Sequence, residues 1–244
     1  MTMIISHRFK YLFVQLPRTG STAVADELYE NYEGERILNK HSTYQDFLKQ
    51  AAAEEKTYFV FSSIRNPLDD AVSHYFKCKN DHKGNFTVPK RVARRKGIVN
   101  HMDNEIYRYL KKTNADFPTF FLKFYRTPYN NWADLAHRKF DYVIRFENLV
   151  EDFATVLKML NIEPKRPLPL VNLTARRTRS YVSYYSTREA IARANWVFGP
   201  FMREWGYEFP REWGDMRVTW WNQLEYDFLN VFRTMYWKYL RYRI

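Results

Sequence analysis

Residues 11–27 read YLFVQLPRTGSTAVADE, and this order of residue types predicts a strand, a tight loop and the start of a helix. The apolar run at 11–16 is rich in β-forming residues and is typical of a buried strand. Pro17 cannot continue a central strand, and Gly20 permits a backbone bend that a residue with a Cβ would resist. Small and apolar residues then follow at helical spacing. We therefore expect loop and helix N–H groups to converge on one anion, most often a phosphate.

Arg18 adds a fixed positive charge and a fork of N–H donors to this loop. The loop is not a Walker A motif, because Ser21 stands where that motif carries lysine. It resembles the 5′-phosphosulfate loop of sulfotransferases that use 3′-phosphoadenosine 5′-phosphosulfate (PAPS), whose usual form is Pro-Lys/Arg-Thr/Ser-Gly-Ser/Thr-Ser/Thr. Residues 17–22, PRTGST, fit that form at every position. The alternative interpretation is an ordinary capped turn between a strand and a helix.

The composition allows one large, basic domain. The chain has 244 residues, enough for a sizeable core, and a formal net charge of +12. Such a charge indicates anionic partners: a phosphorylated cofactor, an acidic glycan, nucleic acid or a membrane surface. Cys78 is the single cysteine, so no intrachain disulfide can form and a reducing compartment is the simplest interpretation. Neither a signal peptide nor a transmembrane run is visible, and we expect a cytoplasmic protein.

A second motif follows the clearest predicted strand, residues 57–64. Arg65 ends this strand, and Ser73 lies eight residues later on a predicted helix. A strand-end arginine and a hydroxyl two helical turns along can both face a phosphate at the sheet edge. With Tyr75 two positions after the serine, the segment resembles the 3′-phosphate motif of sulfotransferases. The alternative is an arginine that caps the sheet and a solvated serine.

His41 is the candidate general base. It follows a short predicted strand at 35–39, and ligands bind at the carboxyl ends of strands in open α/β sheets. A neutral imidazole there could take a proton from an acceptor hydroxyl, whereas a surface or capping histidine is the structural alternative. The context Lys40-His41-Ser42-Thr43 resembles glycan-modifying sulfotransferases, in which the histidine of that context acts as the base.

A basic loop late in the chain, residues 172–181, resembles the sulfotransferase segment that folds over the 3′-phosphate. Arg179 and Tyr181 fit that segment best, although the choice among Arg176, Arg177 and Arg179 stays open.

The acceptor is less clearly marked. Residues 79–96 are polar and basic, which suits either a loop for an anionic or hydroxyl-rich acceptor or a solvated run of charge. Tyr125, Tyr129 and Trp132 are candidate acceptor contacts, although aromatic residues more often belong to the core. No nucleic-acid reading module accompanies the charge, which disfavours nucleic acid as a partner.

Residues 211–244 predict a C-terminal helical extension of a domain at 1–210. Its apolar stripe comprises Trp221, Leu224, Phe228, Phe232, Met235 and Tyr239. The stripe would pack on its own domain or on a second subunit, so a homodimer is one expectation. Peripheral contact with an anionic membrane is the alternative.

Over residues 11–210 the motifs together resemble PAPS-dependent sulfotransferases of the glycan-modifying type. The resemblance implies a P-loop-like, three-layer α/β/α fold with a central, mainly parallel sheet. It also implies transfer of a sulfonate group from PAPS to a hydroxyl, or less often an amine, of a small molecule or glycan. An obligatory metal is not expected. Two other classes stay open: a P-loop kinase or NTPase, and a non-catalytic basic protein that binds nucleotide or glycan.

The resemblance also implies roles for the motif residues. The 5′-phosphate would bind the amides of residues 19–22 together with the hydroxyls of Ser21 and Thr22. The 3′-phosphate would bind Arg65, Ser73 and the Arg179 loop of the later motifs. Arg18 would stabilise the charge on the leaving phosphate, and His41 would deprotonate the acceptor.

Overall fold

The structure is a computed structural model, which describes residues 3–38, 42–93, 98–131, 140–169, 179–236 and 239. The chain divides into two compact units, each built from segments that are separate in the sequence. The first, here called the sheet unit, comprises Met1–Asn66, Asn130–Leu173 and Asp227–Ile244. The second, the helical unit, comprises Pro67–Tyr129 and Thr174–Tyr226. The expected boundary after residue 210 stays a prediction.

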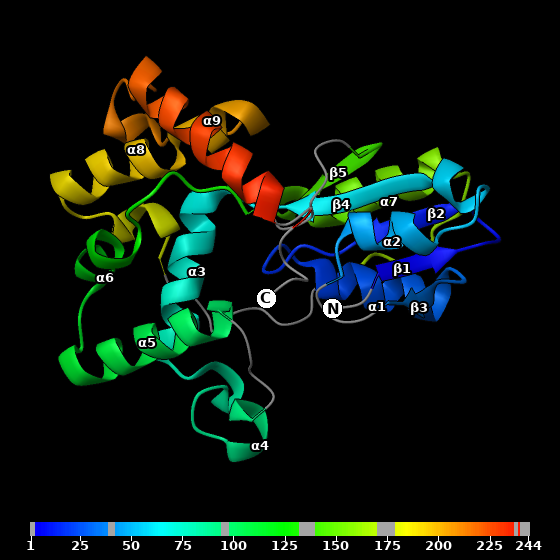
Figure 1. The fold of residues 1–244 in the computed structure, drawn as a ribbon, viewed down its shortest axis with the longest axis horizontal. Helices are drawn as coiled ribbons and strands as arrows, with labels where there is room; N and C mark the ends of the chain where they lie inside the picture. The colour runs from blue at the N-terminus through cyan, green and yellow to red at the C-terminus, as the bar shows by residue number, and fades with distance from the viewer. Residues whose placement is uncertain are drawn as a thin grey trace. The chain divides into compact units, whose positions relative to one another are not determined.

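One sheet with the strand order β3-β1-β2-β4-β5 organises the sheet unit (Figure 1). The strands are β1 (Met3–Ser6), β2 (Tyr11–Val14), β3 (Glu35–Ile37), β4 (Phe59–Ile64) and β5 (Tyr142–Arg145). β2, β4 and β5 are parallel neighbours, whereas β1 is antiparallel to both β2 and β3. All strands of this sheet except β1 therefore run in one direction. This confirms the predicted α/β fold with a mainly parallel central sheet.

The motifs do not predict β1. Ile4 pairs with Phe13 and Ile5 with Leu12 across an antiparallel ladder, and every residue of β1 is buried. A strand this short and wholly buried shows no alternation that would distinguish it from other apolar runs. Its presence makes β2 an interior strand, so the loop that follows β2 begins from a rigid part of the sheet.

Helices α1 (Ser21–Asn31), α2 (Tyr44–Gln50) and α7 (Leu149–Met159) belong to the sheet unit. Thr43 caps α2 through a capping box with Asp46. Side chains of the strands, α1 and α7 form one buried cluster, which includes Phe13, Val24, Leu28, Phe61, Ile144 and Phe153. Burial of each such side chain contributes about 1.5–3 kcal/mol, so this cluster holds the two helices against the sheet.

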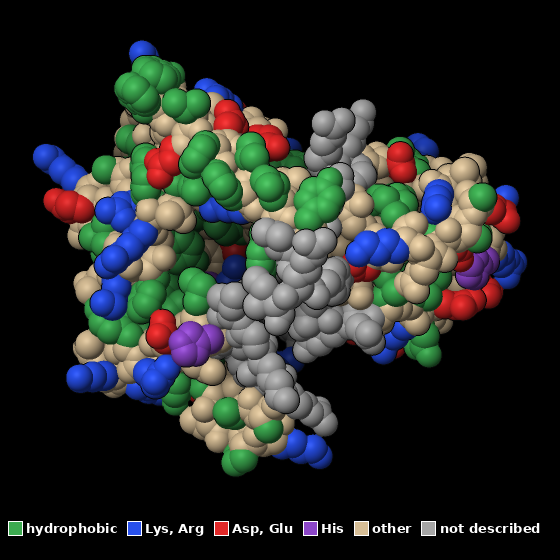
Figure 2. Space-filling model, in the orientation of Figure 1, with side chains coloured by type: hydrophobic (Ala, Val, Ile, Leu, Met, Phe, Trp, Pro, Cys, Tyr) green, Lys and Arg blue, Asp and Glu red, His purple; other side chains and the backbone are tan. Residues whose placement is uncertain are grey.

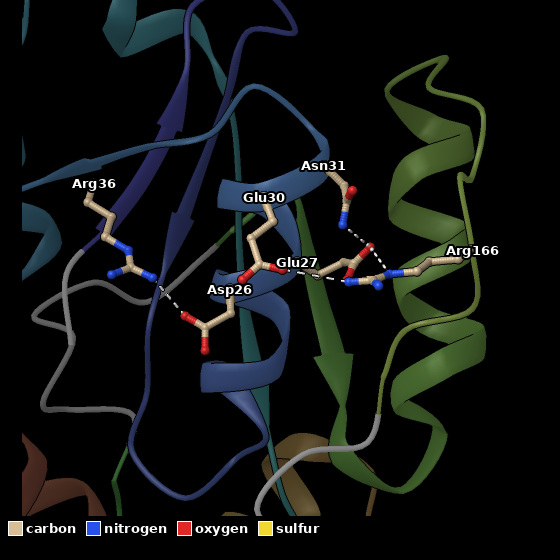
Figure 3. A network of polar contacts seen from close by, with 6 residues as sticks. All are labelled: Asp26, Glu27, Glu30, Asn31, Arg36 and Arg166. Atoms are coloured by element: carbon tan, nitrogen blue, oxygen red, sulfur yellow. Dashed lines mark hydrogen bonds and ion pairs between the residues drawn. The ribbon is translucent and has the colours of Figure 1, made fainter.

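A buried carboxylate on α1 is compensated by an arginine from the segment after α7 (Figure 3). Glu27 is only 2 % exposed. Arg166 Nη2 lies 2.8 Å from Glu27 Oε2, and Asn31 donates to Oε1 at 2.8 Å. Because an unpaired charge is costly to bury, this contact links the segment after α7 to α1.

The helical unit contains α3 (Pro67–Lys79), α4 (Pro89–Val92), α5 (Ile98–Thr113), α6 (Phe117–Phe124) and α8 (Arg188–Trp205). Its core is largely aromatic and includes Tyr75, Phe117, Phe120, Phe121, Tyr185 and Phe198. The rings of Phe117 and Tyr185 meet edge to face at 4.8 Å, an arrangement that aromatic pairs prefer. Tyr125 and Tyr129 pack against this core, whereas Trp132 lies outside the described residues.

Two short helical segments occupy the basic stretch that the sequence suggested was a long loop. They are η2 (His82–Gly84) and α4. Arg91 of α4 joins them, because its guanidinium donates a hydrogen bond to the Lys83 carbonyl in η2.

The last helix, α9 (Trp220–Met235), begins in the helical unit and ends in the sheet unit. Within the described part of the chain, every helix is too short or too polar to cross a bilayer.

Candidate functional site

The loop between β2 and α1 is held in place by buried hydroxyl groups. Thr19 Oγ1 donates to the Leu16 carbonyl at 2.8 Å and lies 2.6 Å from Ser63 Oγ on β4. Ser21 Oγ donates to the same carbonyl at 2.7 Å. Thr19 and Ser21 are both buried, whereas Thr22 is exposed. The Ser21 hydroxyl proton is therefore used inside the loop, and Thr22 presents the hydroxyl that is open to a ligand.

The backbone of this loop takes an uncommon path. Arg18 has a φ of 67° and Gly20 a φ of 75°, both in the left-handed region. Gly20 is the N-cap of α1, and a Cβ on it would lie 2.9 Å from Leu149 Cδ2 and 3.0 Å from Phe146 Cδ2. No side chain fits at this position, so bare backbone lines the start of the helix. The first N–H groups of a helix have no partner within it, and here they can face an anion.

Arg65 lies directly beside this loop. It follows β4, is 7 % exposed, and donates from Nη1 to the Arg18 carbonyl at 3.1 Å. Its guanidinium also stacks over the ring of Phe146 at 4.0 Å. The structure thus brings together Arg18 and Arg65, which the sequence assigned to the two phosphates of one cofactor. Two cations at the mouth of an amide-lined loop create a positive potential that favours an anionic ligand.

The remaining phosphate candidates lie in the helical unit. Ser73 is a buried residue of α3. Arg179 is exposed, and Tyr181 begins η5 (Tyr181–Tyr184), which packs against α3 through Tyr184 and Phe76, with ring centroids 5.2 Å apart. Their binding roles stay predictions.

Three residues of the predicted site fall outside the described residues: His41, the candidate base, and Arg176 and Arg177, the alternatives to Arg179.

A buried polar cluster between α3 and α5 was not predicted. His74 Nε2 lies 2.7 Å from Asp103 Oδ1, and Lys77 Nζ donates to Oδ2 at 2.9 Å. Burial alone would raise the pKa of Asp103. The hydrogen bond and charge of His74, together with Lys77, outweigh burial and hold that pKa far below its usual range. The sequence offers no signal for this cluster, because Asp103 lies 29 and 26 positions from its partners His74 and Lys77 and shares no motif with them.

The same cluster contains a set of potential metal ligands. Ligand atoms of His74, Cys78 and Asp103 lie within 4.8 Å of one another, whereas the sequence showed no such grouping. Both carboxylate oxygens of Asp103 already have cationic or N–H partners in His74 and Lys77. This arrangement favours a structural bridge between α3 and α5 over an ion site.

A hollow of about 480 Å³ opens elsewhere on the helical unit. Leu122 and Arg126 line it from α6 and the residues after it, and Arg193 and Trp196 from α8. Arg193 lies over the Trp196 ring at 5.5 Å. Two guanidinium groups beside an indole suit an anionic ligand that has a ring to stack.

Comparison with known proteins gives one match. A family model described as "Sulfotransferase family" matches residues 1–195. No curated protein matches the chain, and no solved structure does. The matched residues contain the β2–α1 loop, β4 with Arg65, and α3 with Ser73. Since the match covers most of the chain, this protein belongs to the sulfotransferase family and transfers a sulfonyl group.

Proposed function

We propose that the protein transfers the sulfonate group of PAPS to a hydroxyl of an acceptor and releases adenosine 3′,5′-bisphosphate. An amine acceptor is the alternative. The observation that carries the proposal is the β2–α1 loop, in which Arg18 and Gly20 have left-handed backbone and Arg65, from the end of β4, donates to the Arg18 carbonyl. In the reaction, the acceptor oxygen bonds to sulfur while the bond from sulfur to the bridging phosphate oxygen breaks.

The described residues fit the 5′ end of such a donor. A Cβ at Gly20 would clash with Leu149 and Phe146, so these side chains pack directly against the backbone of the loop and hold the start of α1 in place. The amides of residues 19–22 and the Thr22 hydroxyl would bind the 5′-phosphate. Arg18 stays charged at any working pH, so it suits stabilisation of the charge that develops on the leaving oxygen.

The donor's 3′-phosphate is assigned to three residues, Arg65, Ser73 and Arg179. Tyr181, two positions after Arg179, belongs to the same predicted binding segment. Arg65 supports this assignment best, because it is held at the end of β4 by its contacts with Arg18 and Phe146. The assignment of Ser73 and Arg179 depends on their positions in the sequence motifs.

The acceptor is proposed to be anionic or rich in hydroxyl groups. The net charge of +12 favours an acidic partner.

Thermal unfolding with three ligands separates this function from its rivals. Adenosine 3′,5′-bisphosphate should raise the unfolding temperature at concentrations where ATP with Mg²⁺ does not, whether or not a heparin-like polymer, which resembles the proposed acidic acceptor, also raises it. A ligand present at about 100 times its Kd stabilises by about 2.7 kcal/mol. Transfer of labelled sulfonate from PAPS to a panel of glycans then tests turnover. Stabilisation by ATP with Mg²⁺ alone would support a kinase or NTPase, and stabilisation by the polymer alone a non-catalytic binding protein.

His41 is proposed as the general base that takes the acceptor proton. His41→Ala should lower turnover about 10²–10⁴-fold while the affinity for adenosine 3′,5′-bisphosphate stays unchanged. Undiminished turnover would remove His41 from this role, whereas a parallel loss of nucleotide affinity would indicate a part in binding.

A further inference from the structure

Helix α9 turns its polar side toward the protein. Asn222 and Tyr226 are 4 % and 2 % exposed. Asn222 Nδ2 donates to the Trp196 carbonyl at 2.8 Å, and the Tyr226 hydroxyl bonds to Glu204. In the second half of the helix, Asn230 Oδ1 accepts a hydrogen bond from Asn130 Nδ2 at 3.1 Å. Polar contacts therefore anchor α9 along its length.

The opposite side of α9 is apolar and open to solvent. Seven large side chains there are each between 49 % and 65 % exposed: Trp220, Trp221, Leu224, Phe228, Val231, Phe232 and Met235. Their spacing of three or four residues places them on one face of the helix. Figure 2 shows hydrophobic side chains gathered along α9. We call these seven residues the apolar face of α9.

This orientation is the reverse of the usual one, in which an amphipathic helix buries its apolar stripe. Aromatic side chains carry about 150–250 Å² each, so the apolar face exposes on the order of 700–1,000 Å². The largest apolar patch of a typical monomer measures about 300–600 Å² and is often functional. A surface of this size and composition indicates an interaction site.

We propose that the apolar face of α9 is the contact surface of a homodimer, in which it packs on the same face of a second copy. Two such faces together would bury on the order of 1,500–2,000 Å², the size of a standard stable interface. A two-fold axis uses one patch on both copies, so no second complementary surface is needed. Aromatic residues without charges are also typical of the centre of homodimer interfaces.

The charges of α9 favour a protein partner over a bilayer. Helices that lie on anionic membranes carry many lysines and arginines beside their apolar face. Residues 220–235 contain Glu225 and Asp227 against a single cation, Arg233. Acidic residues beside the apolar face would be repelled by anionic lipids, but they can form the polar rim of a protein interface.

Sedimentation of the full chain over a range of concentrations tests the proposal. The wild type should sediment as a dimer, and Phe228→Glu should raise the dimer dissociation constant at least about a hundredfold, since it places a charge in the middle of the face on both copies. Leu224→Glu should act in the same way. Met159→Glu is the matched control, because Met159 is also 50 % exposed but lies on α7; it should leave the dimer intact.

Phe228 is exposed, so its substitution should leave the circular dichroism spectrum of the protein unchanged, and a change in association can then be assigned to the surface. A monomeric wild type, or a dimer that survives both α9 variants, would overturn the proposal. Binding of the wild type to phosphatidylserine vesicles that Phe228→Glu abolishes, without any dimer, would assign the face to lipid and overturn it as well.

Discussion

Gly20 shows how strongly the backbone of the β2–α1 loop depends on a single residue. Its φ of 75° is costly for any residue with a Cβ, and an added Cβ would approach Leu149 Cδ2 to 2.9 Å. Gly20→Ala should therefore destabilise the fold by at least about 1–2 kcal/mol and weaken nucleotide binding. Urea unfolding and titration with adenosine 3′,5′-bisphosphate measure the two effects.

The control for this substitution is Gly214→Ala. Gly214 also has a positive φ, of 77°, but a Cβ there would meet nothing within 4 Å. Its ψ of −158° lies in a region that is essentially restricted to glycine, so Gly214→Ala should lose stability through backbone strain alone and still bind nucleotide normally. If Gly20→Ala binds as tightly as the wild type, the loop does not receive a phosphate at this point.

Arg65 is predicted to read the 3′-phosphate. Arg65→Ala should weaken binding of adenosine 3′,5′-bisphosphate much more than binding of adenosine 5′-monophosphate, because only the first ligand has the group that the guanidinium contacts. Calorimetric titration of both nucleotides measures the ratio. Arg65 also donates to the Arg18 carbonyl, so a general disturbance of the loop would weaken both ligands equally and exclude the specific role.

At the scale of elements, the His74–Asp103–Lys77 cluster connects α3 to α5. Asp103 is 4 % exposed, and breaking a buried ion pair by removal of one partner typically costs about 3–5 kcal/mol. Asp103→Asn should therefore lower the free energy of unfolding by a similar amount at neutral pH. Chemical denaturation of both proteins across a series of pH values provides the measurement.

The pH dependence of that difference has a definite sign. The pKa of Asp103 is lower in the folded protein than the value of about 3.9 expected in the unfolded chain. The carboxylate thus contributes its full stabilisation above about pH 4 and loses it as the pH falls further toward the folded pKa. The difference in the free energy of unfolding between the wild type and Asp103→Asn should therefore decrease below about pH 4. If this difference in the free energy of unfolding does not change with pH, the charge of Asp103 is not the source of the stabilisation.

At the scale of the whole molecule, the net charge of +12 should speed the capture of anionic ligands. Steering of this kind raises association rates by about 10–10³-fold at low salt, and it fades as the Debye length falls from about 30 Å at 0.01 M to about 3 Å at 1 M. The association rate of adenosine 3′,5′-bisphosphate should therefore fall at least about tenfold across this range. Stopped-flow measurements test it, with uncharged adenosine as the control. A rate that does not respond to salt would contradict steering.

The predictable part of the fold consists of its local elements. The strand before Pro17, the loop at residues 17–20 and the strand before Arg65 follow from residue types that restrict their own backbone. The fold class was implied by the resemblance of the loop motifs to those of sulfotransferases. β1 was not predicted, because a buried run of four residues shows no alternation of apolar and polar side chains.

Part of the candidate site could likewise be predicted from the sequence, and part could not. The motifs around Arg18 and Arg65 are visible along the chain, but the hydrogen bond between them joins residues 47 positions apart. It exists because β2 and β4 are adjacent and parallel. The bond between His74 and Asp103, in contrast, depends on how α3 and α5 pack, and no spacing rule in the sequence predicts it.

By itself, the sequence determined the strands that end before Pro17 and Arg65, the bend at Gly20, and which side chains of α9 share a face, since each of these depends on neighbours within a few residues. Only the tertiary structure decided that the polar side of α9 is the buried one. Periodicity shows that a helix has two faces, but the side that is covered depends on the groups that packing brings opposite it, here the Trp196 carbonyl and Glu204.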